Sequence, residues 1–128
     1  MLKVSNHEQS VLLPGDIEKQ TERKLIQLYS EKLASTVLIA PHHGSNTSST
    51  TDFINAINPT VVLFPAAYLN RYHFLSKKVQ KRYKNKNIVS YSTGKAGALS
   101  IHFQSGEKLK KKSWRQQSKK IWTSVPTD

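Results

Sequence analysis

The chain has 128 residues, a net charge of +12 and no cysteine, so disulfide bonds, thiolate metal ligands and a cysteine nucleophile are excluded. The length fits one domain, and a hydrophobic share of 37% is low for a globular chain without reaching the range of disordered ones. The longest apolar run, residues 60–69, contains a proline and is far shorter than the about 20 residues of a membrane-spanning helix, so the chain should be soluble by its own sequence.

The first predicted elements are two short strands, residues 2–5 and 10–13, joined by a polar hairpin turn. A helix follows over about residues 18–33, because apolar residues recur there at near-helical spacing. Asp16 stands just before this helix, where an N-cap residue belongs. A capping role is therefore one interpretation of Asp16.

The middle of the chain alternates between strands and helices. Buried strands are predicted at residues 36–39 and 60–64 from their β-branched, apolar composition, with a short helix at about residues 52–57 between them. A basic helix over residues 75–83 and a strand at residues 88–91 come next. Helices that alternate with buried strands predict an α/β or α+β fold, in which helices pack on a sheet.

The last predicted strand, residues 98–103, alternates apolar and polar side chains. From residue 104 onward the chain is basic and poor in apolar anchors. We therefore expect a domain over residues 1–103 and a basic, flexible tail over residues 104–128.

Two short motifs place ionisable residues directly after predicted strands. Asp16 follows Pro14-Gly15, and His42 and His43 stand within Pro41-His-His-Gly-Ser45. Open α/β sheets build their binding sites at the carboxyl ends of strands. Imidazole and carboxylate groups suit zinc or manganese, and two such cations about 4 Å apart are a common device for phosphate-ester hydrolysis. A surface loop is the alternative interpretation of the histidine pair.

The order of these motifs resembles the metallo-β-lactamase superfamily: Gly-Asp-Ile-Glu at 15–18, a helix, then Pro-His-His-Gly-Ser at 41–45. Within that superfamily the chain resembles the C-terminal domain of the ComEC family of competence DNA-internalisation channels. Asn-Arg-Tyr-His-Phe at 70–74 and Thr-Gly-Lys-Ala-Gly at 93–97 carry this part of the resemblance, which covers about residues 2–103. It implies the C-terminal half of a metallo-β-lactamase-type αββα fold.

The resemblance also implies residue roles. Asp16 resembles the metal-bridging aspartate, and one histidine of the His42–His43 pair resembles the last metal ligand, with His43 favoured because it directly precedes the glycine. In an intact domain, Asp16 and His43 would help to hold two divalent cations, zinc or manganese, that generate the attacking hydroxide. The implied activity is that of a phosphodiesterase or nuclease on incoming DNA.

Two departures from the family pattern limit these roles. The family's His-x-His-x-Asp-His element normally lies upstream of Gly-Asp, ahead of the position of Met1, so we expect weak or no metal binding and no activity from this chain alone. We also expect an uncovered apolar sheet face, because the upstream half supplies the opposing sheet. Relatives usually read Pro-His-Pro where this chain has Leu-Ser-Lys at 75–77, so the histidine is replaced by Ser76.

The positive charge lies almost entirely in the second part of the chain. Residues 1–52 have a net charge of −1, whereas residues 53–128 have a net charge of +13. Such asymmetry indicates a polyanionic partner, either nucleic acid or an anionic membrane surface. The candidate nucleic-acid contacts are Asn70, Arg71, Lys77, Lys78, Lys81, Arg82, Lys110, Lys111, Lys112 and Arg115.

Three hypotheses follow. The leading one is a piece of a DNA-uptake protein whose partners are DNA, the upstream half of its own domain and a channel portion in the bacterial inner membrane. The second is a non-catalytic, basic DNA-binding module. The third is a different hydrolase of the metallo-β-lactamase superfamily, against which the Asn-Arg-Tyr loop and the basic tail argue.

Overall fold

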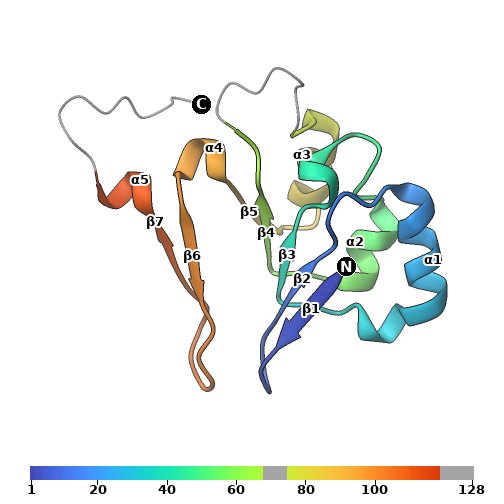
Figure 1. Cartoon of the computed structure of the whole chain (residues 1–128), viewed down its shortest axis with the longest axis horizontal. Coiled ribbons are helices and arrows are strands. Elements are labelled where there is room, and N and C mark those ends of the chain that lie inside the picture. The colour runs from blue at the N-terminus through green and yellow to red at the C-terminus, as the bar shows by residue number, and fades with distance from the viewer. Residues whose placement is uncertain (68–74, 119–128) are drawn as a thin grey trace.

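The main sheet of the computed structural model, which describes residues 1–67 and 75–118, has five strands within those residues (Figure 1). The two N-terminal strands pair antiparallel, and the remaining neighbours pair parallel. In order across the sheet they are β1 (Leu2–Ser5), β2 (Ser10–Leu13), β3 (Val37–Ile39), β4 (Val61–Phe64) and β5 (Val89–Ser92). Each of these strands was predicted from the sequence to within two residues.

Three helices pack on one face of this sheet: α1 (Lys19–Tyr29), α2 (Thr51–Ile57) and α3 (Lys77–Lys84). The turn η1 (Ser30–Lys32) completes the segment that the sequence predicted as one helix up to residue 33. No helix in the described part of the chain is long and apolar enough to cross a bilayer. The α/β content and the helix-on-sheet packing confirm the predicted fold class.

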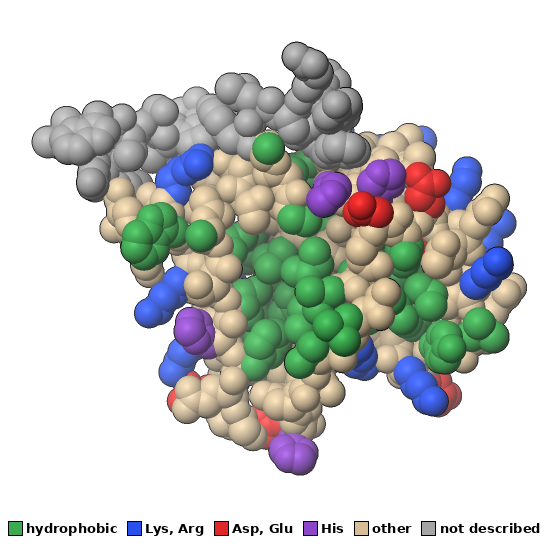
Figure 2. Space-filling model, viewed as in Figure 1, with side chains coloured by type: hydrophobic (Ala, Val, Ile, Leu, Met, Phe, Trp, Pro, Cys, Tyr) green, Lys and Arg blue, Asp and Glu red, His purple; other side chains and the backbone are tan. Residues whose placement is uncertain are grey.

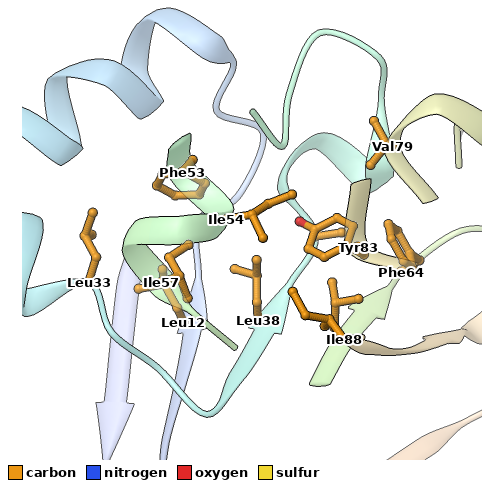
Figure 3. Close-up of a cluster of buried hydrophobic side chains, with 12 residues drawn as sticks. Leu12, Leu33, Leu38, Phe53, Ile54, Ile57, Phe64, Val79, Tyr83 and Ile88 are labelled. Carbon is orange, nitrogen blue, oxygen red and sulfur yellow. The ribbon is translucent and has the colours of Figure 1, made fainter. Parts of the chain in front are cut away.

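The core lies between this sheet and the helices (Figure 3). Side chains alternate along each strand, so Leu12, Leu38 and Val62 all point to the helical side, where they are fully buried. Phe64 meets Tyr83 of α3 edge to face, with ring centroids 5.5 Å apart. Buried residues of α2 and α3 fill the space between, which anchors both helices and the loops that precede them.

The opposite face of the sheet is also apolar, and its outer strands are exposed. The strand register aligns Val11, Val37, Val61 and Val89 across four neighbouring strands on this face. Figure 2 shows hydrophobic side chains gathered over the strands at the centre of this view. The exposed large hydrophobic residues of the sheet are Leu2, Val4, Leu13 and Val89. Val37 and Val61, in the middle of the valine row, are buried, so the apolar face predicted from the sequence is present but only partly uncovered.

A second, two-stranded sheet is formed by β6 (Leu99–His102) and β7 (Lys110–Ser113), followed by the short helix α5 (Trp114–Gln117). Its turn is tied to the β1–β2 turn, because Gln9 Nε2 donates to Glu107 O at 2.9 Å and Gly106 N donates to Glu8 Oε2 at 2.8 Å. The prediction of a flexible tail from residue 104 onward therefore did not anticipate the strand and helix at residues 110–117. A lysine run resembles a solvated tail, yet charged side chains are common on edge strands.

We expect the purified chain to self-associate through the exposed sheet face. Val4→Lys combined with Leu13→Lys should shift the sedimentation profile toward the monomer, because both side chains lie on this face and are 53% and 38% exposed. Leu28→Lys is the matched control, since Leu28 is 70% exposed on α1, outside the sheet. A monomeric parent chain, or an equal shift in the Leu28→Lys variant, would contradict the prediction.

Candidate metal site

The candidate site forms where two loops leave the carboxyl ends of adjacent parallel strands. Leu12 of β2 lies opposite Leu38 of β3, so the Gly-Asp loop (residues 14–18) and the histidine loop (residues 40–50) emerge side by side. The backbone N–H of His42 donates to Gly15 O at 3.1 Å and joins the two loops directly. In Figure 2, acidic and histidine side chains lie together at the upper edge of this face. The sequence motifs thus meet in space.

Asp16 and His43 face one another across these loops. His43 Nε2 lies 3.5 Å from Asp16 Oδ1, and the two side chains are 43% and 69% exposed. The other ring nitrogen, Nδ1, lies 3.0 Å from the carbonyl oxygen of Pro65. A carbonyl oxygen only accepts hydrogen bonds, so Nδ1 carries the proton and Nε2 carries the lone pair in the neutral ring. The nitrogen able to ligate a cation is therefore the one directed at the carboxylate.

The donor atoms of this pair fit a divalent cation. Two ligands of one tetrahedral ion, each about 2.1 Å from it, lie about 3.4 Å from one another, close to the observed 3.5 Å. A backbone carbonyl that accepts from the second ring nitrogen, as Pro65 does, is the usual support of a metal-binding histidine. Within residues 1–67 and 75–118 no group of three or more His, Asp or Glu side chains could hold an ion. The described residues thus offer a pair of ligands, and not a full shell.

His42 points to a different carboxylate. Its Nδ1 lies 3.4 Å from Glu18 Oε1 and 3.5 Å from Thr47 Oγ1, while Thr47 Oγ1 itself donates to Glu18 at 2.8 Å. Glu18 occupies the N-cap position of α1, so the structure does not support the interpretation of Asp16 as the helix cap. The geometry distinguishes the two histidines that the sequence left unresolved: His43 is the partner of Asp16.

Both histidines have left-handed backbone conformations, with φ values of 47° and 54°. This region is unfavourable for residues other than glycine, at a cost of about 1–3 kcal/mol each. Gly44 follows at φ 83° within the turn η2 (Pro41–Gly44). Such conformations persist only where the surroundings hold them, and they cluster at functional sites.

A buried carboxylate that sequence reasoning did not identify holds the next part of the loop. Glu22 of α1 is fully buried and accepts from Ser49 N at 2.6 Å and from Thr50 N at 2.9 Å. Thr50 is the N-cap of α2, so Glu22 links α1 to the start of α2. A sequence signal existed: Glu22 stands three and four residues before Leu25 and Ile26, on the buried stripe of the helix.

Helix α3 supports the same loop from the other side. Arg82 donates from Nη1 to Ser48 O at 3.0 Å and to Ser49 O at 2.8 Å, and Tyr83 donates to Ser49 Oγ at 3.0 Å. Burial raises the pKa of the Tyr83 hydroxyl well above its usual range, so Tyr83 remains a neutral donor. Ser48 and Ser49 are fully buried. The loop after the histidines is therefore fixed from both helices.

The other predicted DNA contacts belong to separate elements, and Asn70 and Arg71 lie outside the described residues. Lys77, Lys78 and Lys81 are exposed on α3. On the hairpin, Lys110 forms an ion pair with Glu107, and Lys111 lies 5.0 Å from the ring centroid of Tyr91. Arg115 donates to Gly94 O at 2.8 Å, and Lys112 is exposed on β7. Arg82 and Arg115 thus have intramolecular partners, which the sequence did not predict.

No family model matches the chain. Three curated proteins are similar to it in sequence. Over 137 aligned positions that include the whole chain, it is 34% identical to 17% of a protein of Escherichia coli (strain K12) that carries the name "Uncharacterized protein YcaI". It is 35% identical over 99 residues, 77% of the chain, to Competence protein ComA of Neisseria gonorrhoeae, and 28% identical over 95 residues, 74% of the chain, to ComE operon protein 3 of Bacillus subtilis (strain 168). The chain spans only 12–17% of the length of these relatives.

Proposed function

We propose, from its homology to one segment of proteins named for competence, that this chain is part of a DNA-uptake system and that its Asp16–His43 pair belongs to a metal-dependent phosphodiesterase site. The single observation that carries the catalytic part is the pairing of His43 Nε2 with Asp16 at the carboxyl ends of parallel strands. The wider DNA-uptake role, with a channel in the bacterial inner membrane as partner, is likewise a proposal.

The proposed fold is the C-terminal half of a metallo-β-lactamase-type domain. Helices cover one face of the sheet, and the other face is apolar and partly exposed, which fits a second sheet packed against it. We assign that second sheet, and the remaining metal ligands, to an upstream half of the domain. This upstream half would then both bury the apolar face and supply the remaining metal ligands next to Asp16 and His43.

In the proposed reaction, each residue of this chain has a limited task. Asp16 and His43 would help to hold two zinc or manganese ions, and Pro65 would orient the His43 ring through its carbonyl oxygen. When bound, divalent cations polarise a phosphoryl oxygen and lower the pKa of water. The exposure of both ligands leaves the site open to a DNA phosphate. Glu22 and Arg82 would keep the histidine loop in place.

Paramagnetic broadening by Mn²⁺ tests the metal site directly. In NMR spectra of the whole chain, the ring signals of His43 should broaden at lower Mn²⁺ concentration than those of His7 or His102. Asp16→Ala should raise the required concentration by at least about tenfold, since loss of even an outer-shell partner costs about 10–100-fold in metal affinity. Glu18→Ala is the matched control, because Glu18 contacts His42. Uniform broadening of all histidines would refute the assignment.

The basic DNA-binding module remains a second candidate, favoured by the net charge of +13 over residues 53–128. Hydrolysis of a phosphodiester with added Mn²⁺ separates the two candidates. Turnover that requires Mn²⁺ and is lost in Asp16→Ala supports the enzyme. Salt-sensitive DNA binding that is unchanged by Asp16→Ala, without turnover even when the upstream half is supplied, supports the module.

A further inference from the structure

We infer that a groove between α3 and the edge strand β5 binds the phosphodiester backbone of single-stranded DNA through Lys77, Lys81 and Lys84, an inference that rests on the proposed role in DNA uptake. The groove has a volume of about 510 Å³. The three lysines stand at i, i+4 and i+7 of α3, so their side chains share one flank of the helix. They form a row about 10 Å long.

The same helix places its other basic residues elsewhere. Val79 and Tyr83 face the core, and Arg82 is directed to the carbonyl groups of the histidine loop. Lys78 is exposed but does not line the groove. Of the basic residues on α3, only Lys77, Lys81 and Lys84 therefore line the groove. The sequence alone had assigned Lys78 and Arg82 to DNA as well and had not assigned Lys84.

The lysine row is not explained by the stability of the fold. Like charges at i and i+4 of a helix destabilise it, as Lys77 and Lys81 must do. Among the described residues, no carboxylate lines the groove and no ion pair joins these lysines to an acidic partner. An external polyanion would offset the repulsion.

The position of the row connects it to the candidate metal site. Lys77 lies in the first turn of α3, and the N–H of Ser76, the N-cap residue of α3, donates to Gly44 O at 3.0 Å, directly after His43. A backbone that follows the row from Lys84 to Lys77 thus arrives beside the histidine loop. The lysine row would guide the DNA strand toward the candidate metal site at Asp16 and His43.

The shape and lining of the groove favour a single strand. Asn87 and Ser90 are exposed and line the groove with polar groups that can form hydrogen bonds with the edge of an unpaired base. In a duplex the Watson–Crick edges of the bases are already occupied by pairing. A flat anionic membrane would meet protruding lysines, whereas these lysines line a concave surface. We therefore commit to single-stranded DNA.

Fluorescence anisotropy of a labelled thymidine oligonucleotide tests the groove, with EDTA present so that no metal contributes. The triple variant Lys77→Ala, Lys81→Ala, Lys84→Ala of the whole chain should weaken binding at least about tenfold at low salt. Because each single-strand phosphate contact contributes about 0.7 to the slope of log K against log salt, the slope should fall by about 2. Lys78→Ala, the control on the same helix, should change the affinity less than about twofold, and Lys81→Arg should retain it.

Circular dichroism melting establishes that the triple variant is folded. An affinity loss in Lys78→Ala as large as in Lys81→Ala would overturn the groove, as would unchanged DNA binding by a folded triple variant. If the triple variant loses binding to phosphatidylglycerol vesicles but still binds DNA, the lysine row is a membrane contact and not a DNA contact. Mn²⁺ broadening at His43 is measured separately, so the groove and the metal site can fail independently.

Discussion

Gly44→Ala should destabilise the protein by about 3 kcal/mol. A Cβ atom at this position would lie 2.8 Å from Phe64 Cδ1 and 3.0 Å from Cε1, and the φ value of 83° is unfavourable for alanine. Phe64 is packed in the core against Tyr83, so its ring cannot move aside without disturbing that core. Overpacking typically costs about 1–3 kcal/mol, and a left-handed non-glycine residue adds about 1–2 kcal/mol. Urea unfolding measures the loss.

Gly15→Ala is the matched control for this substitution. Gly15 has a φ of 72°, similar to that of Gly44, but nothing lies within 4 Å of the added Cβ. Its cost should therefore be the backbone cost alone, about 1–2 kcal/mol. Equal losses in the two variants would mean that Phe64 yields to the new methyl group, and that the clash does not constrain the loop.

The same substitution should also weaken the candidate metal site. Phe64 directly precedes Pro65, whose carbonyl oxygen holds Nδ1 of His43. A shift of Phe64 therefore moves the group that orients the histidine ring. We expect His43 to require more Mn²⁺ for the same broadening in Gly44→Ala than in Gly15→Ala. The absence of a side chain at Gly44 is thus required both for the packing of Phe64 and for the orientation of His43.

Local sequence patterns were sufficient to predict most of the main sheet and its helices. The β-branched, apolar segments before Pro41 and after Pro59 predicted buried strands from their composition and length. Parallel pairing of β2 with β3 then brought Asp16 and the histidines to the same sheet edge, as their positions after the strands predicted. These features depend on periodicity and on strand order, which a sequence displays directly.

Other features depend on contacts between distant residues, and the sequence did not reveal them. The apolar spacing that predicted the helix over residues 18–33 includes Leu28 and Tyr29, yet both are exposed, while Glu22 is buried. His42 and His43 differ in their carboxylate partners, Glu18 and Asp16, and His43 is also oriented by the carbonyl of a proline 22 residues away. Strand β7 is stabilised by pairing with β6 and by contacts such as Ser113 Oγ with Ala96 O at 2.7 Å, so its lysines gave no local signal.

Glu22→Ala should cost about 3–5 kcal/mol, the largest effect that we expect from a single side chain near the site. Removal of one partner from a buried, charged network leaves the others unsatisfied, here the N–H groups of Ser49 and Thr50. Glu22→Gln should cost less, because its amide oxygen still accepts one of the two hydrogen bonds. Glu31→Ala, an exposed glutamate in η1, should change stability by less than about 0.5 kcal/mol.

Amide hydrogen exchange distinguishes a local from a global effect of Glu22→Ala. If the carboxylate holds the loop, the Ser49 and Thr50 amides should lose protection beyond the change in the free energy of unfolding measured with urea. The His43 ring should then also require more Mn²⁺ for broadening, because Ser48 and Ser49 belong to the same loop as the histidine pair. If Glu22→Ala costs no more than Glu31→Ala, then Arg82 and Tyr83 hold the loop without Glu22, and α3 alone positions the histidines.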